Sequence, residues 1–149
     1  MTHEADSANE LRARALRLLA RREHSRAELG RKLTPHAESQ EALADLLSDL
    51  EARKHLSDER FASERVRQLA RKYGVARIRQ DLKARGVDPE LVPGMGEADE
   101  LERARAILAR KYREPAGTRE ERARRMRFLQ SRGFSSETIF KLLSARAEG

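Results

Sequence analysis

Basic side chains gather in a segment whose apolar residues recur with helical spacing. In residues 75–85, Arg79 and Lys83 are four positions apart and share one helix face, while Ile78 and Leu82 form the apolar stripe. Arg77 flanks the basic pair. Guanidinium groups bind phosphates and carboxylates through paired hydrogen bonds. The segment therefore predicts a surface that contacts an anionic partner.

A second basic segment, residues 119–132, is denser still. Its arginines fall into two spacings, and the apolar Met126 and Leu129 are predicted to turn inward. The first spacing contains Arg122, Arg125 and Arg132, and the second contains Arg124 and Arg127. Crowded like charges destabilise a helix unless a partner neutralises them. A merely solvated basic face remains the alternative interpretation.

The sequence lacks the patterns that carry catalysis. It contains no phosphate-binding G-x-x-x-x-G-K-S/T loop, no H-E-x-x-H and no G-x-S-x-G. Cysteine is absent, which excludes thiolate metal sites, and the four histidines are too scattered to share a metal and are predicted at the surface. We therefore expect a binding protein rather than an enzyme, with no catalytic residue, metal or cofactor.

Composition narrows the class of protein further. Charged residues make up 38% of the 149 positions, and the formal net charge is +7. Basic residues predominate in 60–90 and 103–132, which favours an acidic partner such as nucleic acid. Only six aromatic residues are present, so a specialised single-strand binder that stacks on bases is disfavoured. The sequence shows neither a secretion signal nor an apolar span, which predicts a cytoplasmic protein without membrane contact.

The chain repeats itself. LARRE at 19–23 is followed by LARKY at 69–73 and again at 108–112. Residues 74–92 also align with 121–139 at a shift of 47 positions, with six identities. Such self-similarity is typical of helical repeat proteins. The third unit carries an insertion of which REPAGT, residues 113–118, is the main part.

Capping residues and glycines divide each unit into helices. Ser7 with Glu10, Ser25 with Glu28 and Thr118 with Glu121 are predicted capping boxes, and Gly86 and Gly133 suit the residue that ends a helix. The predicted helices are 8–23, 26–33, 37–54, 58–73, 75–85, 89–95, 97–112, 119–132 and 136–147. We expect an all-α protein with three tandem three-helix repeats in an elongated, curved arrangement, divided into modules 8–55, 56–96 and 97–149.

Four motifs in order resemble the RecX regulatory proteins. A leucine-rich first module precedes HLSDERFA at 55–62, RKYGVARIRQDLKARGVDPELV follows at 71–92, and FLQSRGFSSETI stands at 128–139. The family shares an S-D-x-x-F-A helix start, a Y-G-x-x-x-I-x-x-x-L-x-x-x-G-V core and a late R-G-F. The likeness runs from about Ala15 to Leu143.

The resemblance implies a bacterial cytoplasmic protein that takes part in DNA repair, DNA recombination and the SOS response. It implies binding along the groove of the RecA recombinase filament, where the protein restrains ATP hydrolysis and strand exchange. The family offers no catalytic residues to carry over. We expect a monomer that also binds DNA weakly and without strong sequence preference.

Two hypotheses of function follow. In the first, the protein inhibits RecA on its filament, and the expected contacts are Arg67, Lys72, Arg77, Arg79, Lys83, Arg124, Arg125 and Arg127. In the second, it is a helix-turn-helix DNA-binding regulator, since that class also uses three-helix units with a basic helix. The second is less favoured because similar basic helices recur and Gln80 is the main side chain suited to reading adenine.

Overall fold

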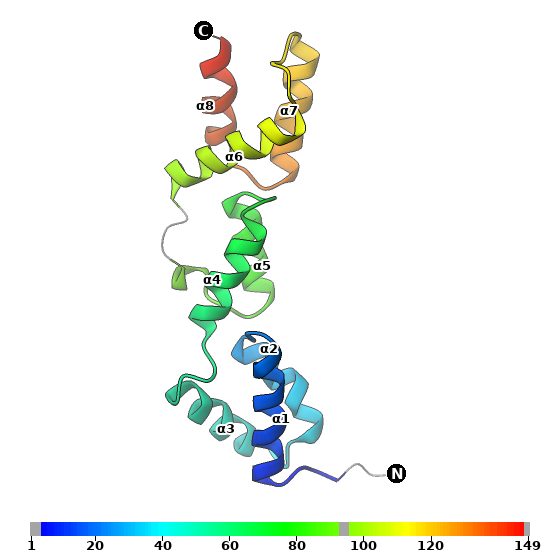
Figure 1. The fold of residues 1–149 in the computed structure, drawn as a ribbon, viewed down its shortest axis with the longest axis vertical. Helices are drawn as coiled ribbons and strands as arrows, with labels where there is room; N and C mark the ends of the chain where they lie inside the picture. Colours follow the sequence, from blue (N-terminus) through cyan, green and yellow to red (C-terminus); the bar gives the residue numbers. More distant parts are fainter. Residues whose placement is uncertain (1–3, 93–95, 148–149) are drawn as a thin grey trace. The chain divides into compact units, whose positions relative to one another are not determined.

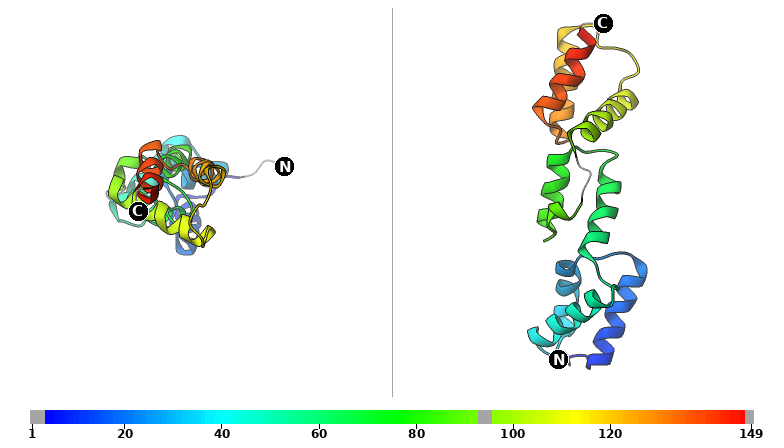
Figure 2. Two further views of the ribbon diagram at one scale, coloured as in Figure 1. Left: turned by 90° about the horizontal axis from the view of Figure 1, so that it is seen from above. Right: turned by 90° about the vertical axis from the view of Figure 1, so that its left-hand side faces the viewer.

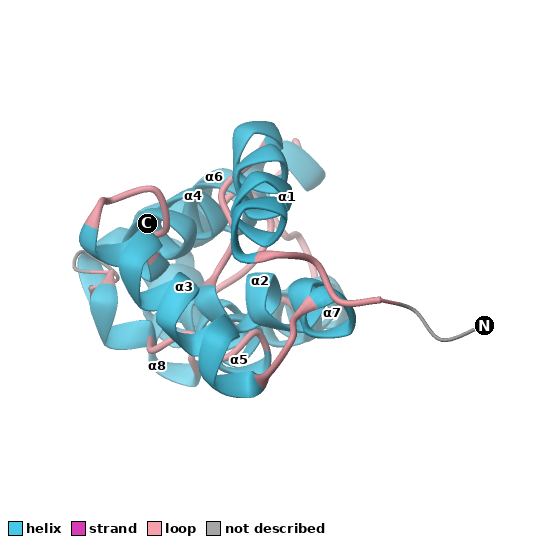
Figure 3. Ribbon diagram, turned by 90° about the horizontal axis from the view of Figure 1, so that it is seen from below, coloured by secondary structure: helices cyan, strands magenta, loops and turns pink. Residues whose placement is uncertain are grey.

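The computed structural model describes residues 4–92 and 96–147, and every regular element within these ranges is a helix (Figures 1 and 3). The α-helices are α1 (Ala8–Arg21), α2 (Arg26–Leu33), α3 (Gln40–Ala52), α4 (Asp58–Leu69), α5 (Val75–Ala84), α6 (Glu97–Lys111), α7 (Arg119–Ser131) and α8 (Ser136–Ala147). Two 3₁₀ turns are also present: η1 (Thr34–His36) lies between α2 and α3, and η2 (Pro89–Leu91) lies between α5 and α6. The all-α prediction is confirmed. None of the described helices is long and apolar enough to span a bilayer.

Local capping explains where most of the helices begin. Ser7 accepts a hydrogen bond from the amide of Glu10, whose carboxylate accepts one from the Ser7 amide, so the predicted capping box is complete. Ser25 also accepts from the amide of Glu28 at 3.0 Å. The Glu28 carboxylate, however, binds the Arg22 guanidinium instead of returning the bond. The second box is therefore only half formed.

The third helix begins later than predicted. The helix predicted over 37–54 begins only at Gln40, as α3, and Thr34 and Pro35 before it form η1. The hydroxyl of Ser39 accepts from the amide of Ala42 and is the true cap. Threonine followed by proline suits either a helix start or a tight turn, and here the turn is formed.

The predicted sixth helix over 89–95 was wrong in its described part. Pro89–Leu91 forms only the 3₁₀ turn η2, and residues 93–95 lie outside the described ranges. A second proline at position 93 disfavours the helical conformation of the residue before it, which explains why Val92 does not continue the turn as a helix. Pro89 is itself buried.

The described helices belong to two compact units. Unit 1 comprises the chain up to Glu64 together with Lys83–Leu91, and unit 2 comprises Arg65–Leu82 together with the chain from Val92 onward. The boundary therefore falls within α4 and α5. In unit 1 the core is almost entirely leucine: Leu11, Ala15, Leu29, Leu33, Leu43, Leu46, Leu47, Leu50 and Leu56. Within α1, α2 and α3 these residues recur at the three- and four-residue spacing of one helix face.

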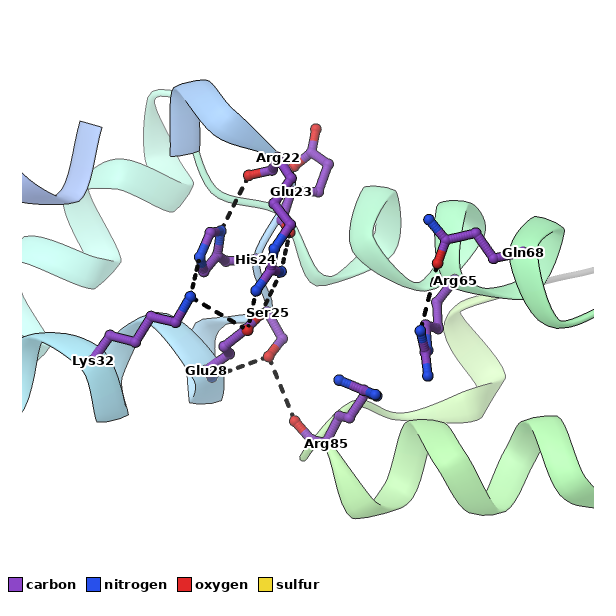
Figure 4. A network of polar contacts seen from close by, with 9 residues as sticks. All are labelled: Arg22, Glu23, His24, Ser25, Glu28, Lys32, Arg65, Gln68 and Arg85. Carbon is purple, nitrogen blue, oxygen red and sulfur yellow. Dashed lines mark hydrogen bonds and ion pairs between the residues drawn. The ribbon is translucent and has the colours of Figure 1, made fainter. Parts of the chain in front are cut away.

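Unit 1 contains a buried histidine, contrary to the prediction that all four histidines lie at the surface. His24 is 1% exposed, and Figure 4 shows its ring between the Arg22 carbonyl and the Lys32 ammonium. Nε2 of His24 is 3.0 Å from Nζ of Lys32, which can only donate, so Nε2 must accept. Nδ1 therefore carries the proton and donates to the carbonyl of Arg22 at 3.1 Å. The contacts require a neutral imidazole.

This network predicts that acid loosens unit 1. Burial lowers the pKa of His24, and the Arg22 guanidinium lowers the pKa of Glu28 to about 2. Because the unfolded chain takes up these protons first, stability falls below the ordinary histidine pKa of 6.5 and again between 4.5 and about 2. We expect the amides of α2 to exchange hydrogen at pH 5 faster than the pH dependence of the base-catalysed exchange reaction alone would predict, because the loss of stability increases opening of unit 1. In His24→Gln the loss of stability below pH 6.5 should be smaller. An unchanged dependence of stability on pH in that variant would show that His24 is not the group responsible.

Unit 2 is built around α6, which packs on both α7 and α8 (Figure 2). Its core is Ala104, Ile107, Leu108, Leu129, Phe134, Ile139, Leu142 and Leu143. A buried carboxylate fixes the start of α8, because Glu100 on α6 accepts a hydrogen bond from the amide of Ser135 at 2.9 Å. The part of α4 that belongs to unit 2 is bound to α5 by Arg65, whose guanidinium makes two hydrogen bonds to the Asp81 carboxylate, at 2.9 and 3.0 Å.

Candidate functional site

A basic cleft in unit 2 is the strongest candidate for a functional site. It encloses about 540 Å³ between the segment that follows α4, helix α6 and the end of α7. Five of the eight lining side chains are cationic, namely Arg71, Lys72, Arg110, Lys111 and Arg132. The remaining three are Tyr73, Ile107 and Phe128, so no acidic side chain lines the described cleft. Such a lining attracts an anionic partner.

The two copies of LARKY meet in this cleft. The guanidinium of Arg110, in the second copy, donates to the carbonyl of Arg71 in the first copy at 2.6 Å. Two turns earlier on α6, Arg103 donates to the carbonyls of Tyr73 at 2.7 Å and Ala70 at 3.4 Å. Two arginines of α6 therefore bind backbone carbonyls of the segment just after α4, where a cation is also favoured by the helix dipole. The repeat places four cations in one cleft.

Aromatic rings support the cations. The guanidinium of Arg132 lies 5.5 Å from the ring centre of Tyr73 and 5.2 Å from that of Phe128. Lys111 places its ammonium 4.0 Å from the Phe128 ring centre, and Arg77 lies 4.6 Å from that of Tyr73. A ring face attracts a cation without neutralising it. The rings thus hold the charges in place and leave them available to an anion.

A contact between two glycines sets the position of the cleft wall. The amide of Gly74 donates to the carbonyl of Arg132 at 2.7 Å, and a Cβ on Gly74 would lie 2.5 Å from the Gly133 carbonyl oxygen. Gly133 has φ of +88°, as predicted for the residue that ends α7. The Y-G and R-G-F motifs are therefore two sides of one close backbone contact. This contact brings Tyr73 and Arg132 to the same cleft.

The structure places the predicted contact residues in several environments. Lys72 lines the cleft, and Arg77 lies beside it, donating to the carbonyl of Ser131 at 3.0 Å. Arg67 is exposed on α4, Arg79 is half-buried on α5, and Lys83 is exposed in the part of α5 that belongs to unit 1. Arg124 and Arg127 are exposed on α7. Of the eight residues, the cleft brings together only Lys72 and, through Tyr73, Arg77.

Arg125 and Met126 exchange their expected places. Arg125 was predicted on the contact surface but is 5% exposed, whereas Met126 was predicted to turn inward but is 38% exposed. The Arg125 guanidinium lies 4.4 Å from the ring centre of Tyr112, and its Nη2 donates to the carbonyl of Glu114 at 2.7 Å. It thereby fastens the inserted 113–118 segment to α7, and burial removes it from the exposed basic surface.

The start of α7 also differs from its predicted capping box. Thr118 accepts from the amide of Glu121 at 3.1 Å, as expected. The Glu121 carboxylate then accepts from the amide of Gly117 at 2.7 Å, one residue before the expected partner. The inserted segment is thus held at both Glu114 and Gly117.

Sequence reasoning left Arg71, Arg110 and Lys111 out of the predicted contacts. Arg132 was assigned to the basic face of 119–132 but was not selected as a contact. The signal that could have identified three of these residues was the repeated LARKY itself, because its basic positions recur together with its tyrosine.

Models of the RecX family match two parts of the chain. The model described as "RecX, second three-helix domain" matches residues 57–92. The model described as "RecX, third three-helix domain" matches residues 97–143, which contain α6, α7 and most of α8. Together they cover more than half of the sequence.

Relatives and solved structures agree with this match. The regulatory protein RecX of Leptothrix cholodnii is 45% identical over 136 residues, covering 89% of this chain and 87% of its own length. That of Ralstonia nicotianae is 43% identical, with 89% and 86% covered. The crystal structure of RecX from Lactobacillus salivarius shares the fold at a TM-score of 0.80 and 18% identity, covering 95% of this chain and 97% of that one. The chain, an all-α helical repeat protein, therefore belongs to the RecX family of regulatory proteins.

Proposed function

We propose that this protein modulates the RecA recombinase as an inhibitor that binds along the RecA–DNA filament and restrains ATP hydrolysis and strand exchange. Membership of the RecX family is the observation that carries the proposal, since the relatives are regulatory proteins. The basic cleft supports it, because five cations in one lining suit a partner that presents acidic groups. The protein acts in the cytoplasm as a monomer and without catalysis.

Within this proposal the chain consists of three modules, at 8–55, 56–96 and 97–149. The matches of residues 57–92 and 97–143 to the models of the second and third RecX domains support the second and third of these modules. The short helix expected to complete the second module is replaced in its described part by η2. In the described part of that module the α-helices are α4 and α5.

The test is ATP turnover by RecA on single-stranded DNA. Adding the protein should lower the steady rate of hydrolysis, and the protein should co-sediment with the filament. Unchanged turnover together with no co-sedimentation would refute the proposed function.

A second measurement asks whether the exposed basic face of α7 contacts the filament. With the double variant Arg124→Glu and Arg127→Glu, roughly tenfold more protein should be needed for the same inhibition. The reason is that losing a charge attraction of about 1 kcal/mol or more weakens the affinity by a factor that approaches ten. Arg125 is left unchanged because its burial would make reversal a test of folding. Arg17→Glu with Arg21→Glu, which alters two exposed cations of α1, is the matched control. Equal inhibition by both double variants would exclude the α7 face.

A further inference from the structure

We infer that the cleft between the two LARKY copies binds the phosphate backbone of a nucleic acid and does not read its bases. The two copies supply four of its five cations, Arg71, Lys72, Arg110 and Lys111, and Arg132 supplies the fifth. This inference assigns a ligand to one cleft of unit 2 and requires no RecA. It therefore stands or falls separately from the proposed function.

The cations of the cleft differ from other basic side chains of the described chain in their partners. Elsewhere in the described chain arginines pair with carboxylates, as in Arg12–Asp49, Arg14–Asp6, Arg22–Glu28 and Arg65–Asp81. In the cleft, Arg110 binds a backbone carbonyl, while Lys111 and Arg132 lie against rings. None of the five has a carboxylate partner among the described residues. An incoming anion therefore meets five charges that are not already neutralised.

The composition of the lining favours nucleic acid over an acidic protein. The cores of protein–protein interfaces are depleted in charged residues, and lysine is depleted across such interfaces. Interfaces with nucleic acid are more polar and much more positively charged. Here the cations outnumber the other lining residues, and the apolar Ile107 is only 6% exposed. The cleft offers charge rather than an apolar anchor.

The rings of the cleft are already occupied. Tyr73 carries Arg77 and Arg132, and Phe128 carries Lys111 and Arg132. Proteins that bind single strands by stacking need ring faces that are open to bases. Tyr73 and Phe128 instead act as supports that position cations. The expected contact is therefore with phosphates, which every sequence presents alike.

The experiment measures binding of labelled 20-nucleotide strands to the intact protein by fluorescence anisotropy at several salt concentrations, without RecA. One strand has mixed sequence, and the other is largely abasic, so that it presents phosphates with few bases. We expect the two affinities to agree within about threefold. Arg71→Gln with Lys72→Gln should weaken both strands and lower the slope of log affinity against log salt by about two, roughly one for each lost phosphate contact.

The control replaces two exposed cations of unit 1. Arg17→Gln with Arg21→Gln removes the same charge and, like the cleft pair, alters side chains with no partner among the described residues. Equal losses in both double variants would show diffuse attraction and overturn the assigned site. A loss of more than tenfold on the abasic strand would show that bases are read. Tighter binding of a polyglutamate peptide than of either strand would assign the cleft to an acidic protein.

The role of the supporting rings is tested at Tyr73. Tyr73→Phe retains the ring beneath Arg77 and Arg132 and should bind the mixed strand like the unaltered protein. Tyr73→Leu removes the ring and should weaken binding about two- to fivefold, which corresponds to a cation–π contact at an accessible site. Melting curves confirm that both variants are folded. Loss of binding in Tyr73→Phe would show that the hydroxyl, rather than the ring, is needed.

Discussion

Replacing Gly74 with alanine is expected to destabilise unit 2 more than any surface change in the chain. The added Cβ would lie 2.5 Å from the carbonyl oxygen of Gly133 and 2.6 Å from the amide nitrogen of Phe134. Both are backbone atoms of a turn in which the carbonyl of Arg132 accepts a hydrogen bond from the Gly74 amide. Neither atom can therefore move away without breaking that hydrogen bond. We expect a loss of about 1–3 kcal/mol or more in the free energy of unfolding, measured by chemical denaturation.

The reciprocal change tests the same contact from the other side. Gly133→Ala would place a Cβ 2.5 Å from that of Arg77 and would impose a side chain on φ of +88°. Gly117→Ala is the matched control in unit 2, since its new Cβ meets only a carboxylate oxygen of Glu121 at 3.7 Å. A Gly74→Ala protein as stable as the control would show that the two motifs are not in contact.

Replacing the buried Arg125 with methionine is expected to have the opposite effect. Arg125 is 5% exposed, and its Nε and Nη1 have no hydrogen-bond partner among the described residues. A buried charge with unmet donors is unfavourable, and apolar replacements of buried ionic groups are often neutral or stabilising by about 1–4 kcal/mol. We therefore expect Arg125→Met to raise the free energy of unfolding, even though it loses the Glu114 hydrogen bond.

The neighbouring arginine supplies the control for this substitution. Arg124→Met makes the same chemical change one position earlier on α7, at an exposed side chain, and should alter stability by no more than about 0.5 kcal/mol. Chemical denaturation of both variants at one pH gives the comparison. A large loss of stability in Arg125→Met alone would show that the guanidinium is satisfied in solution and that it fastens the 113–118 segment.

Most of the helices could be predicted because their starts and ends depend on nearby residues. Ser7, Ser25 and Thr118 cap amides three positions away, and Gly86 and Gly133 adopt the left-handed conformation expected of residues that end helices. Such interactions lie within one turn of the chain, so the sequence contains both partners. The buried apolar residues of α1 to α3 also follow from local spacing, because within each helix they recur three or four positions apart and so share one face.

Errors arose where local signals were ambiguous or sparse. The threonine and proline at 34–35 fit a helix start as well as a turn, and in the structure they form the 3₁₀ turn η1. In α7, arginines occupy nearly every face and the few apolar residues do not define one stripe. The spacing therefore predicted a buried Met126, whereas in the structure Arg125 is buried and Met126 is exposed.

The sequence by itself determined the helical class, the repeated units and the excess of positive charge, because composition and short-range spacing govern all three. Only the tertiary structure decided which cations act together. Arg71 and Arg110 are separated by 39 positions, yet a hydrogen bond of 2.6 Å joins them, and the contact of Gly74 with Gly133 spans 59 positions. Packing between distant helices creates such contacts, and helical periodicity within one segment carries no information about them.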